Sequence, residues 1–467
     1  MYRKEIEGFI DSHREEMIED ICTLCRINSE KMPYVEGKPY GEGPFQALQA
    51  ALGMAEGYGF SIRNYDNYVG TADLNDKERQ LDILAHLDVV PAGEGWTETK
   101  PFEPVVKDGK LFGRGTADDK GPAVAALYAM RAVKELGIPL NKNVRLILGT
   151  DEECGSSDIV NYYDKEDEAP MTFSPDAEFP VINIEKGRLE GHFHASFQAS
   201  EAMPRLVKVE AGIKANVVPG KARAVVEGID LKTLEAAAEA VEKETGISFV
   251  LEGDLPVMTV TAQGEGAHAS TPQEGKNALT GLLVYLTRLP FVECPQMDMV
   301  KNLLKLFPHG DTCGKAAGIS MEDELSGALT LAFSMLTVGA DGLEGVFDSR
   351  CPICATEESV LGVVKQAMAD QGLTLENDSM IPPHHVDGNS HFVRTLLSVY
   401  EEYTGLEGSC QATGGGTYVH SLKNGVAYGA ALPGTDNRMH GADEFAVVDE
   451  LVLSAKIFAQ VIVELCS

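Results

Sequence analysis

The apolar residues in the first part of the chain alternate between strand and helix patterns. Residues 80–90 (QLDILAHLDVV) and 143–150 (NVRLILGT) are nearly continuous apolar runs of strand length, and 171–176 (MTFSPD) is a third strand-like segment. Residues 121–138 have apolar positions at helical spacing, with a proline in the first turn and a glycine near the end. A helix between strands of buried composition predicts a parallel or mixed sheet covered by helices.

From about residue 187 the pattern changes to strand-like segments followed by a helix. The first group consists of the strand-like segments 192–200, 205–212, 222–229 and 256–268 and the helix-like segment 231–246. A second group consists of strand-like residues 329–350 and helix-like residues 359–372. This order predicts an α+β region of two similar halves, although the sequence shows no clear repeat.

The earlier alternation returns after His385, with a helix-like segment at 391–405, a strand at 426–432 and a long final helix from about Asp443. We therefore expect an α/β fold with a mixed sheet, into which an α+β domain is inserted. The expected domains are 1–186 with 386–467 for the discontinuous first domain, and 187–385 for the insertion.

Composition limits the classes to which the protein can belong. A length of 467 residues favours two or three domains, and 44% hydrophobic residues suffice for a sizeable core. The formal net charge of −33 argues against nucleic acid as a partner, because a phosphate backbone requires a basic surface. The N-terminus has the pattern of a charged amphipathic helix without a signal peptide's apolar stretch. No apolar run is long enough to span a bilayer, so no membrane partner is expected.

The nine cysteines are odd in number and lack the spacing of a disulfide framework, which favours a reducing, cytoplasmic location. Two CxxC pairs, Cys22/Cys25 and Cys351/Cys354, raise the alternative of a structural zinc site. Because Cys22 and Cys25 fall on apolar positions of a helical pattern, we expect them to be core residues instead.

Acidic residues and histidines gather where the predicted segments end. Five clusters fit this description: His86 with Asp88, Asp118 with Asp119, Glu152 with Glu153, Asp176, and His440. The carboxyl ends of sheet strands are where α/β folds bind ligands, so all five clusters could converge on one crevice.

Each cluster alone has an ordinary structural explanation. A His-x-Asp at a strand end is more often structural, a Glu-Glu pair suits the first turn of a helix, and GRGTADDKG could be a turn with an Asp N-cap. As a set, two histidines and three carboxylates suit zinc, cobalt or manganese, and one carboxylate can bridge two ions about 3.5–4 Å apart. A further carboxylate would take the proton of a shared water and deliver it to the leaving amine.

Six ordered motifs that extend over nearly the whole chain resemble one enzyme family. They are HLDVVP, GRGTADDKGP, TDEECGSSD, SPDAEFP, GEGAHASTPQEGKNA and MHGADE. The motifs closely resemble those of the co-catalytic metallopeptidase family of carboxypeptidase G, acetylornithine deacetylase, succinyl-diaminopimelate desuccinylase and aminoacylase. Within that family the chain looks most like the bacterial Xaa-His (β-alanyl) dipeptidases, whose long lid domain is similar to the inserted stretch here.

The resemblance implies a dimetal α/β catalytic domain with an α+β lid. It also implies two divalent ions, with Zn²⁺ as the first candidate and Mn²⁺ or Co²⁺ as alternatives. The ligands carried over from the family are His86 and Asp176 for one ion, Glu153 and His440 for the other, and Asp118 as the bridge.

The resemblance further implies roles for residues around the ions. Glu152 would be the general base, and Asp88 would hydrogen-bond the imidazole of His86 and fix its tautomer. His268, in the lid, would reach the substrate carbonyl and stabilise the oxyanion. The substrate-binding positions that match the family are Asn216 in ANVVPG, Arg350 in FDSRCP, and Gly415, Gly416 and Thr417 in GGGTY.

What the resemblance implies is a cytoplasmic dipeptidase that cleaves small unblocked peptides of the Xaa-His or β-Ala-Xaa type. An N-acyl amino acid deacylase shares every metal residue and remains an alternative; lid length and the setting of Arg350 favour the dipeptidase. A non-catalytic binding protein on the same scaffold would not need Glu152. Because the enlarged lid could supply His268 within one chain, we expect a monomer.

Overall fold

The computed structural model describes residues 2–467, whose contacts divide them into two compact units. Unit 1 contains the chain as far as Ile184 together with His385–Gln411 and Gly416–Ser467. Unit 2 contains Glu185–His384 and Ala412–Gly415. Among the described residues, no helix combines the length and the apolar character needed to cross a membrane.

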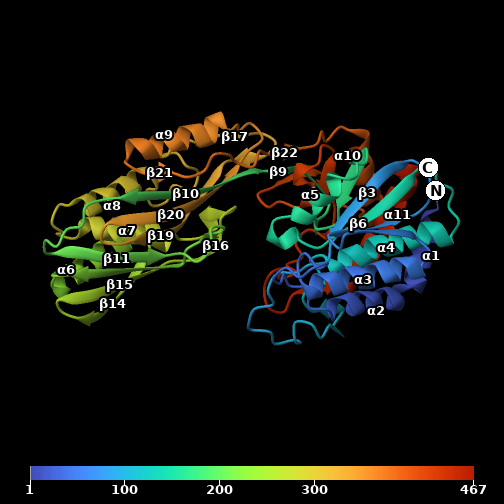
Figure 1. The fold of residues 1–467 in the computed structure, drawn as a ribbon, viewed down its shortest axis with the longest axis horizontal. Coiled ribbons are helices and arrows are strands. Elements are labelled where there is room, and N and C mark those ends of the chain that lie inside the picture. The colour runs from blue at the N-terminus through green and yellow to red at the C-terminus, as the bar shows by residue number, and fades with distance from the viewer. Residues whose placement is uncertain (1) are drawn as a thin grey trace. The chain divides into compact units, whose positions relative to one another are not determined.

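Unit 1 contains a nine-stranded mixed sheet with helices packed on it (Figure 1). The strands follow the spatial order β1 (Ser61–Tyr65), β2 (Val69–Asp73), β6 (Asn143–Gly149), β3 (Arg79–His86), β7 (Met171–Ser174), β24 (Gly425–Ala427), β9 (Val181–Glu185) and β22 (His384–His385), with β23 (Cys410–Thr413) beside β9. The smaller strands are β4 (Val105–Lys107), β5 (Lys110–Phe112), β8 (Ala177–Glu178), β25 (Ala430–Ala431) and β26 (Phe445–Val447). The mixed α/β class expected from the sequence is confirmed.

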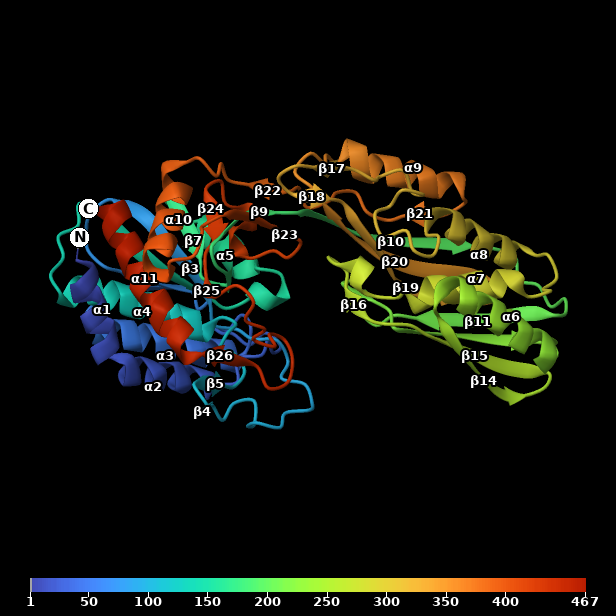
Figure 2. The ribbon, with the colours of Figure 1, turned by 180° about the vertical axis from the view of Figure 1, so that it is seen from behind.

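The helices of unit 1 come from both ends of the chain. They are α1 (Arg3–Ser12), α2 (Arg14–Cys25), α3 (Glu42–Gly57), α4 (Lys120–Glu135), α5 (Ser157–Tyr163), α10 (His391–Thr404) and α11 (Val448–Cys466), with the 3₁₀ turns η1 (Glu152–Cys154) and η4 (Tyr418–Ser421). Helices α4 and α11 pack against each other and against β3 (Figure 2). The last helix, α11, therefore packs beside a helix from the first third of the chain, α4, and both contact the sheet at β3.

Strand β3 shows how the sheet sends residues to two different cores. Alternate residues of a strand face opposite sides, and Ile83 and Ala85 belong to the large core that contains α4 and α11. Leu84 belongs to a smaller core with aromatic residues of α5 and η4. His86 shares the parity of Leu84, and its ring meets the ring of Tyr418 edge-on at 6.2 Å between centroids. The sheet's pleat thus directs His86 toward the side that α5 and η4 cover.

The structure corrects three boundaries that were expected from the sequence. Helix α11 begins at Val448 rather than near Asp443, because Phe445–Val447 first pair with β5 as strand β26. The N-terminal segment forms two helices, since His13 leaves the helical conformation between α1 and α2. The segment 426–432 contains two short strands, β24 and β25, rather than one.

Unit 2 is built on an eight-stranded antiparallel sheet. Its order is β14 (Ser248–Asp254), β15 (Val257–Gln263), β13 (Lys221–Glu227), β11 (Arg205–Ala211), β19 (Thr330–Val338), β20 (Gly342–Cys351), β10 (Gly187–Ser196) and β21 (Thr374–Leu375). Its helices are α6 (Leu231–Thr245), α7 (Ala278–Arg288), α8 (Pro295–Leu306) and α9 (Val363–Asp370), with η2 (Pro272–Glu274) and a π-helical turn, η3 (Glu358–Gly362). Two strand pairs stand apart: β12 (Val217–Val218) with β16 (Ala267–His268), and β17 (Glu322–Asp323) with β18 (Gly327–Ala328). Buried and exposed residues alternate along β10, as in a sheet with one face on a core.

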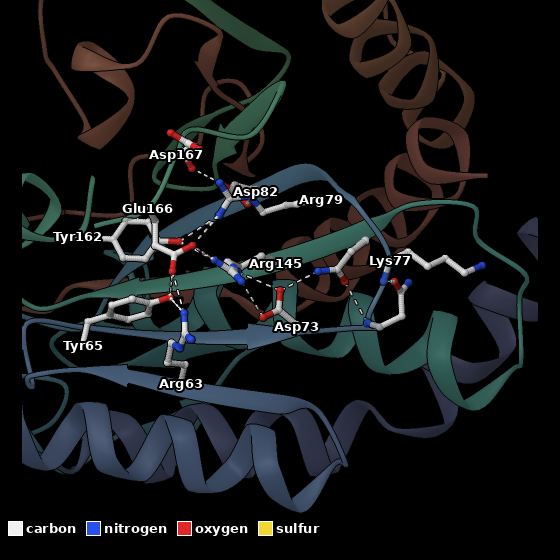
Figure 3. Close-up of polar contacts among 12 residues, drawn as sticks. Arg63, Tyr65, Asp73, Lys77, Arg79, Asp82, Arg145, Tyr162, Glu166 and Asp167 are labelled. Carbon is white, nitrogen blue, oxygen red and sulfur yellow. Dashed lines mark hydrogen bonds and ion pairs between the residues drawn. The ribbon is translucent and has the colours of Figure 1, made fainter. Parts of the chain in front are cut away.

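A partly buried polar cluster connects strands of unit 1 near the amino ends of β3 and β6 (Figure 3). Arg145 donates two hydrogen bonds to Asp73, of 2.9 and 3.0 Å, and one of 3.1 Å to Glu166. Asp82 is fully buried, and neither carboxylate oxygen has hydrogen-bond geometry with any described residue. The Nε of Arg79 lies 3.6 Å from its Oδ1. Burial, only partly offset by Arg79, raises the pKa of Asp82 to about 7.

Asp82 is expected to make stability decrease as the pH rises from about 5 to 8. The folded protein holds the Asp82 proton over a pH range in which the unfolded chain has already released it. The stabilisation from that proton is complete below the unfolded pKa of about 4 and is lost as the pH rises through the folded value. The variant Asp82→Asn removes the titrating group without changing its shape.

Urea unfolding near pH 5, 6.5 and 8 tests this expectation. The free energy of unfolding should decrease less steeply with pH in Asp82→Asn than in the native protein. Asp378→Asn, at a position 96% exposed, should follow the native curve. A constant difference between Asp82→Asn and the native protein at all three pH values would contradict the assignment.

Candidate metal centre

Three neighbouring parallel strands bring most of the candidate ligands to one edge of the unit 1 sheet. Strands β6, β3 and β7 run parallel, and His86 pairs in register with Gly149 at the end of β6. His86 is the last residue of β3, Glu152 and Glu153 lie in η1 just after β6, and Asp176 follows β7 by two residues. Shared strand direction thus gathers residues that are far apart in sequence.

Two loops supply the remaining candidate ligands. Asp118 lies between β5 and α4, and His440 lies between β25 and β26. His440 has a φ of 62°, a left-handed conformation that is uncommon for non-glycine residues, although histidine is among those that adopt it more often. Nearby Arg438 and Asp443 are also left-handed, with φ of 54° and 57°.

The ligand candidates form two groups that have Asp118 in common. His86, Asp118 and Asp176 form one group, and Asp118, Glu153 and His440 form the other; within each group the donor atoms lie within 4.8 Å of one another. Asp118 turns one oxygen to each histidine: Oδ1 lies 2.9 Å from Nε2 of His86, and Oδ2 lies 2.9 Å from Nε2 of His440. One carboxylate therefore connects the two groups.

The two remaining carboxylates lie close to the same ring nitrogens. Oδ2 of Asp176 is 3.6 Å from Nε2 of His86, and Oε1 of Glu153 is 3.1 Å from Nε2 of His440. Imidazole nitrogens and carboxylate oxygens suit Zn²⁺, Mn²⁺ and Co²⁺, which makes both groups candidate metal sites.

The orientation of His86 fits a metal ligand. Its Nδ1 lies 3.0 Å from the main-chain carbonyl of Asp88, which can only accept, so Nδ1 carries the proton. Nε2 is therefore unprotonated in the neutral ring. It is fully buried and, within residues 2–467, has no partner in hydrogen-bond geometry despite the two nearby carboxylates. A lone pair directed between carboxylate oxygens is what a bound cation requires.

Burial and like charge govern the electrostatics of this edge. Burial and the neighbouring Asp118 carboxylate raise the pKa of Asp176 to about 7. Burial also raises the pKa of Glu152 well above its usual range, with contributions from Asp176, Glu153 and Asp118. Burial would lower the pKa of His86, but the nearby carboxylates of Asp118 and Asp176 outweigh it and raise that pKa. Several carboxylates in one buried site hold a positive charge or a proton between them.

Asp88 fixes two neighbours in different ways. Its main-chain carbonyl sets the tautomer of His86, whereas its carboxylate Oδ1 lies 3.5 Å from Nδ1 of that ring. The carboxylate accepts the amide hydrogens of Glu152 and Glu153, each at 3.1 Å. Besides lying near the imidazole of His86, as expected from the sequence, the Asp88 carboxylate therefore holds the start of η1.

Asp158 also fixes the backbone before η1, and sequence reasoning missed it. Its buried carboxylate accepts the amides of Thr150 and Asp151 at 2.5 and 3.0 Å and the hydroxyl of Tyr418 at 2.5 Å. Asp151 in turn receives Nζ of Lys31 at 2.6 Å. The signal available in the sequence was the second aspartate in TDEECGSSD, nine residues after the end of β6.

Glu444 holds the loop that carries Asp118. Its fully buried carboxylate accepts a hydrogen bond from Nη1 of Arg114 at 2.5 Å. It also accepts hydrogen bonds from the main-chain amides of Gly115 and Ala117, at 2.9 and 3.1 Å. Burial and the charge of Asp118 raise its pKa to about 7, against the lowering effect of Arg114. Glu444 lies four residues after His440 in MHGADE, so one segment supplies a candidate ligand and anchors the loop of another.

Lys120 connects the same loop to the N-terminal helices. Its side chain is fully buried, and Nζ donates to the carbonyls of Leu24 and Ile27 at 3.0 and 2.8 Å, just where α2 ends. Burial lowers the pKa of Lys120 to about 8. An ammonium near the last carbonyls of a helix also compensates the helix dipole.

The candidate substrate residues of unit 2 lie in two places. Asn216 and His268 are neighbours, because β12 pairs with β16 and the amide of Ala269 donates to the carbonyl of Asn216 at 2.9 Å. Arg350 lies on β20, and its Nη1 donates to the carbonyl of Gly414 at 2.5 Å. Of the predicted turn, Gly415 belongs to unit 2, while Gly416 and Thr417 belong to unit 1.

The cysteines do not contribute to either ligand group found among residues 2–467. Cys22 and Cys25 are buried in the core of unit 1, and Cys351 is buried in that of unit 2. Cys154 and Cys354 are exposed.

Comparisons with known proteins agree with the geometry of the site. The family described as Peptidase family M20/M25/M40 matches residues 83–464. The chain is 35% identical to the Beta-Ala-Xaa dipeptidase of Lactobacillus delbrueckii subsp. lactis, over 97% of each chain. It is also 35% identical to the protein YtjP of Bacillus subtilis (strain 168), again over 97% of each.

Solved structures show the same fold at much lower identity. Human carnosine dipeptidase 1 has a TM-score of 0.60 at 14% identity, with 100% of this chain and 99% of that chain covered. The aminoacylhistidine dipeptidase of Vibrio alginolyticus has a TM-score of 0.58 at 13% identity, with 96% of each covered.

Replacing Glu444 with Gln is expected to destabilise the loop that carries Asp118. The change leaves Arg114 buried without its carboxylate, and breaking a buried pair on one side costs about 3–5 kcal/mol. That is a large part of a typical domain stability of about 5–15 kcal/mol, so urea unfolding should detect it. Glu103→Gln, which breaks an exposed pair with Lys100, is the matched control and should leave the unfolding midpoint unchanged. Equal midpoints for both variants would show that Glu444 does not anchor the loop.

Proposed function

The chain belongs to peptidase family M20/M25/M40, and from this we propose that it is a dinuclear metal-dependent dipeptidase acting on unblocked dipeptides. Membership makes it a peptide-bond hydrolase. The observation that carries the rest is the pair of ligand groups joined by Asp118. The Lactobacillus relative, named a Beta-Ala-Xaa dipeptidase, supports dipeptides of the β-Ala-Xaa or Xaa-His type as substrates.

The donor set supports an assignment of residues to the two ions. We assign His86 and Asp176 to one ion, Glu153 and His440 to the other, and Asp118 to both. Zn²⁺ is the first candidate for such nitrogen and oxygen ligands, with Mn²⁺ and Co²⁺ as alternatives. When bound, a pair of such ions polarises a carbonyl and lowers the pKa of metal-bound water toward neutrality.

Glu152 is the proposed general base. It follows β6 on the turn that Asp88 fixes, and it is adjacent in sequence to the candidate ligand Glu153. Its carboxylate would take the proton from the attacking water and deliver it to the leaving amine, so that the amine departs neutral. The proposed role of Asp88 is to hold the backbone from which both glutamates project.

The residues of unit 2 are proposed to bind the substrate. His268 would donate a hydrogen bond to the substrate carbonyl oxygen as negative charge develops there. Arg350, with Asn216 and the turn at Gly415, Gly416 and Thr417, would bind the free C-terminal carboxylate. A guanidinium matches a carboxylate with two parallel hydrogen bonds, which favours substrates of one fixed length. The alternative is an N-acyl amino acid deacylase, which a comparison of free dipeptides with N-acyl amino acids distinguishes from a dipeptidase.

Chelation is expected to abolish activity, and Glu152→Gln to abolish it without loss of metal. Removing a general base typically costs about 10²–10⁴ in kcat, because the water's proton then has no positioned acceptor. Metal content by mass spectrometry and kcat on a free dipeptide would be measured together. His86→Ala is the comparison variant and should lower the metal content itself. Near-native turnover of Glu152→Gln would show that another group is the base, and active protein with only trace divalent metal would overturn the metal assignment.

Arg350→Ala is expected to impair free dipeptides more than C-terminally amidated ones. A hydrogen bond to a charged group contributes about 1.5–3 kcal/mol, which corresponds to about ten- to a hundred-fold in kcat/KM. His268→Ala should instead reduce kcat on both substrates, because it acts on the oxyanion. Free dipeptides, amidated dipeptides and N-acyl amino acids would be compared in parallel. Equal losses on free and amidated substrates in Arg350→Ala would contradict the carboxylate role and remove the main argument against a deacylase.

A further inference from the structure

Ser270, two residues after His268, determines which ring nitrogen of His268 carries the proton. The main-chain amide of Ser270 donates to Nδ1 of His268 at 3.2 Å, and the Ser270 hydroxyl lies 2.6 Å from the same nitrogen. A backbone N–H can only donate, so Nδ1 must be the acceptor. The proton of the neutral imidazole is therefore on Nε2, at the tip of the ring.

This tautomer is the opposite of that of His86. In His86 the main-chain carbonyl of Asp88 places the proton on Nδ1 and leaves Nε2 as a lone pair, which suits a metal ligand. In His268 the amide and hydroxyl of Ser270 leave Nε2 as a donor, which suits a carbonyl oxygen. The local backbone thus assigns two histidines to opposite kinds of chemistry.

The turn at Gly414 lies against Ser270. A Cβ placed on Gly414 would lie 2.6 Å from the Cβ of Ser270, closer than such atoms approach in proteins, so position 414 has no room for a side chain. The carbonyl of Gly414 accepts Nη1 of Arg350 at 2.5 Å. One turn therefore contacts both the serine that orients His268 and the guanidinium of Arg350.

The guanidinium of Arg350 is also fixed from its other side. Nε and Nη2 donate to the two oxygens of Asp348 at 2.6 and 3.0 Å, and Asp348 is fully buried. With Gly414 these contacts use three of the five N–H groups of an arginine. The two that remain are on the terminal nitrogens, where they can meet a carboxylate. Asp348 also receives Nε of Arg188 at 3.0 Å, so a second cation compensates its charge.

We propose that Ser270 is a positioning residue that holds His268 as an Nε2–H donor, and that Gly414 is the spacer that fixes Ser270 relative to Arg350. For activity, this inference rests on the proposed function; for the tautomer it does not. Because His268 acts as a neutral donor, it gives a hydrogen bond to the developing oxyanion and transfers no proton. The proton of the water remains the task of Glu152.

A purely structural role of Ser270 makes different predictions. If the hydroxyl only stabilised the turn before η2, Ser270→Ala would lower the thermal unfolding temperature and leave the chemistry of His268 unchanged. A positioning role predicts the reverse. It predicts an altered tautomer population and a lower kcat, with little change in KM and in the unfolding temperature.

Nuclear magnetic resonance of protein labelled with ¹⁵N-histidine reads the tautomer without any need for activity. The His268 signals are assigned by their loss in His268→Gln. We expect the native protein to show only the Nε2–H form. Ser270→Ala keeps the 3.2 Å amide bond to Nδ1 but loses the shorter 2.6 Å hydroxyl contact, so we expect some Nδ1–H form beside the Nε2–H form. If the amide alone set the tautomer, Ser270→Ala would keep the single Nε2–H form. A native Nδ1–H form, or an unchanged single tautomer in Ser270→Ala, would overturn the inference, even in a protein that cleaves no dipeptide.

Kinetics on a free dipeptide test the spacer. We expect Ser270→Ala to lower kcat about five-fold, the worth of one neutral hydrogen bond, and Ser12→Ala, a helix serine of unit 1, to change nothing. Gly414→Ala should raise KM and lower kcat together, since the new methyl group displaces the turn. Combining Gly414→Ala with Ser270→Gly removes the clash, so KM should recover while kcat stays low. Gly414→Ala with native KM, or a double variant whose KM does not recover, would overturn the spacer role. Native protein inactive on every dipeptide would refute the proposed function instead, with the tautomer measurement still decisive for Ser270.

Discussion

The structure of the site depends on how one buried carboxylate is shared between two histidines. Asp118 turns an oxygen to His86 and another to His440, and it is only 6% exposed. Further carboxylates crowd the same edge, and burial together with their like charge raises the pKa of Asp176 and of Glu152. Like charges at this density are unfavourable in a buried place unless cations or protons lie among them. The repulsion is thus a reason for the site to bind divalent metal, and the fold must hold the carboxylates together until it does.

The fold meets that need with a second group of acids that accept backbone amides. Asp88 receives the two amides at the start of η1, Asp158 receives those just before it, and Glu444 receives those of the loop before Asp118. A carboxylate that accepts amide hydrogens fixes the backbone without adding a side chain to the site. Several of the acids behind the chain's negative charge therefore position candidate ligands rather than bind ions. This explains why the ligands can lie on loops and turns and still be placed reproducibly.

Candidate ligands could be proposed from the sequence where the signal is local. His86 ends a strand, and Glu153 and Asp176 follow strands, that can be recognised by their apolar runs; parallel neighbours end at one edge. Sequence reasoning missed the residues whose role depends on distant partners: Glu444 and Arg114 are 330 positions apart, and Lys120 reaches back 96 positions to α2. Nothing in a local pattern distinguishes such a pair from surface charges. The start of α11 was misplaced for the same reason, because β26 exists only through its pairing with β5.

The contacts that Gly414 makes with Arg350 and Ser270 in unit 2 suggest how substrate binding could contribute to turnover. Interactions that are equally strong in the ground state and in the transition state lower KM without raising kcat. A substrate carboxylate bound by Arg350, as proposed, would make the same contacts throughout the reaction, so alone it would give affinity. Gly414 joins that contact to Ser270, whose hydrogen bonds determine where His268 carries its proton. The proposed substrate carboxylate would lie against the turn at Gly414, which also contacts the serine that orients His268. In that case only a peptide of the correct length would place its scissile carbonyl opposite His268. A longer peptide would then lose turnover as well as affinity, because its carbonyl would no longer lie opposite Nε2 when its carboxylate reached Arg350.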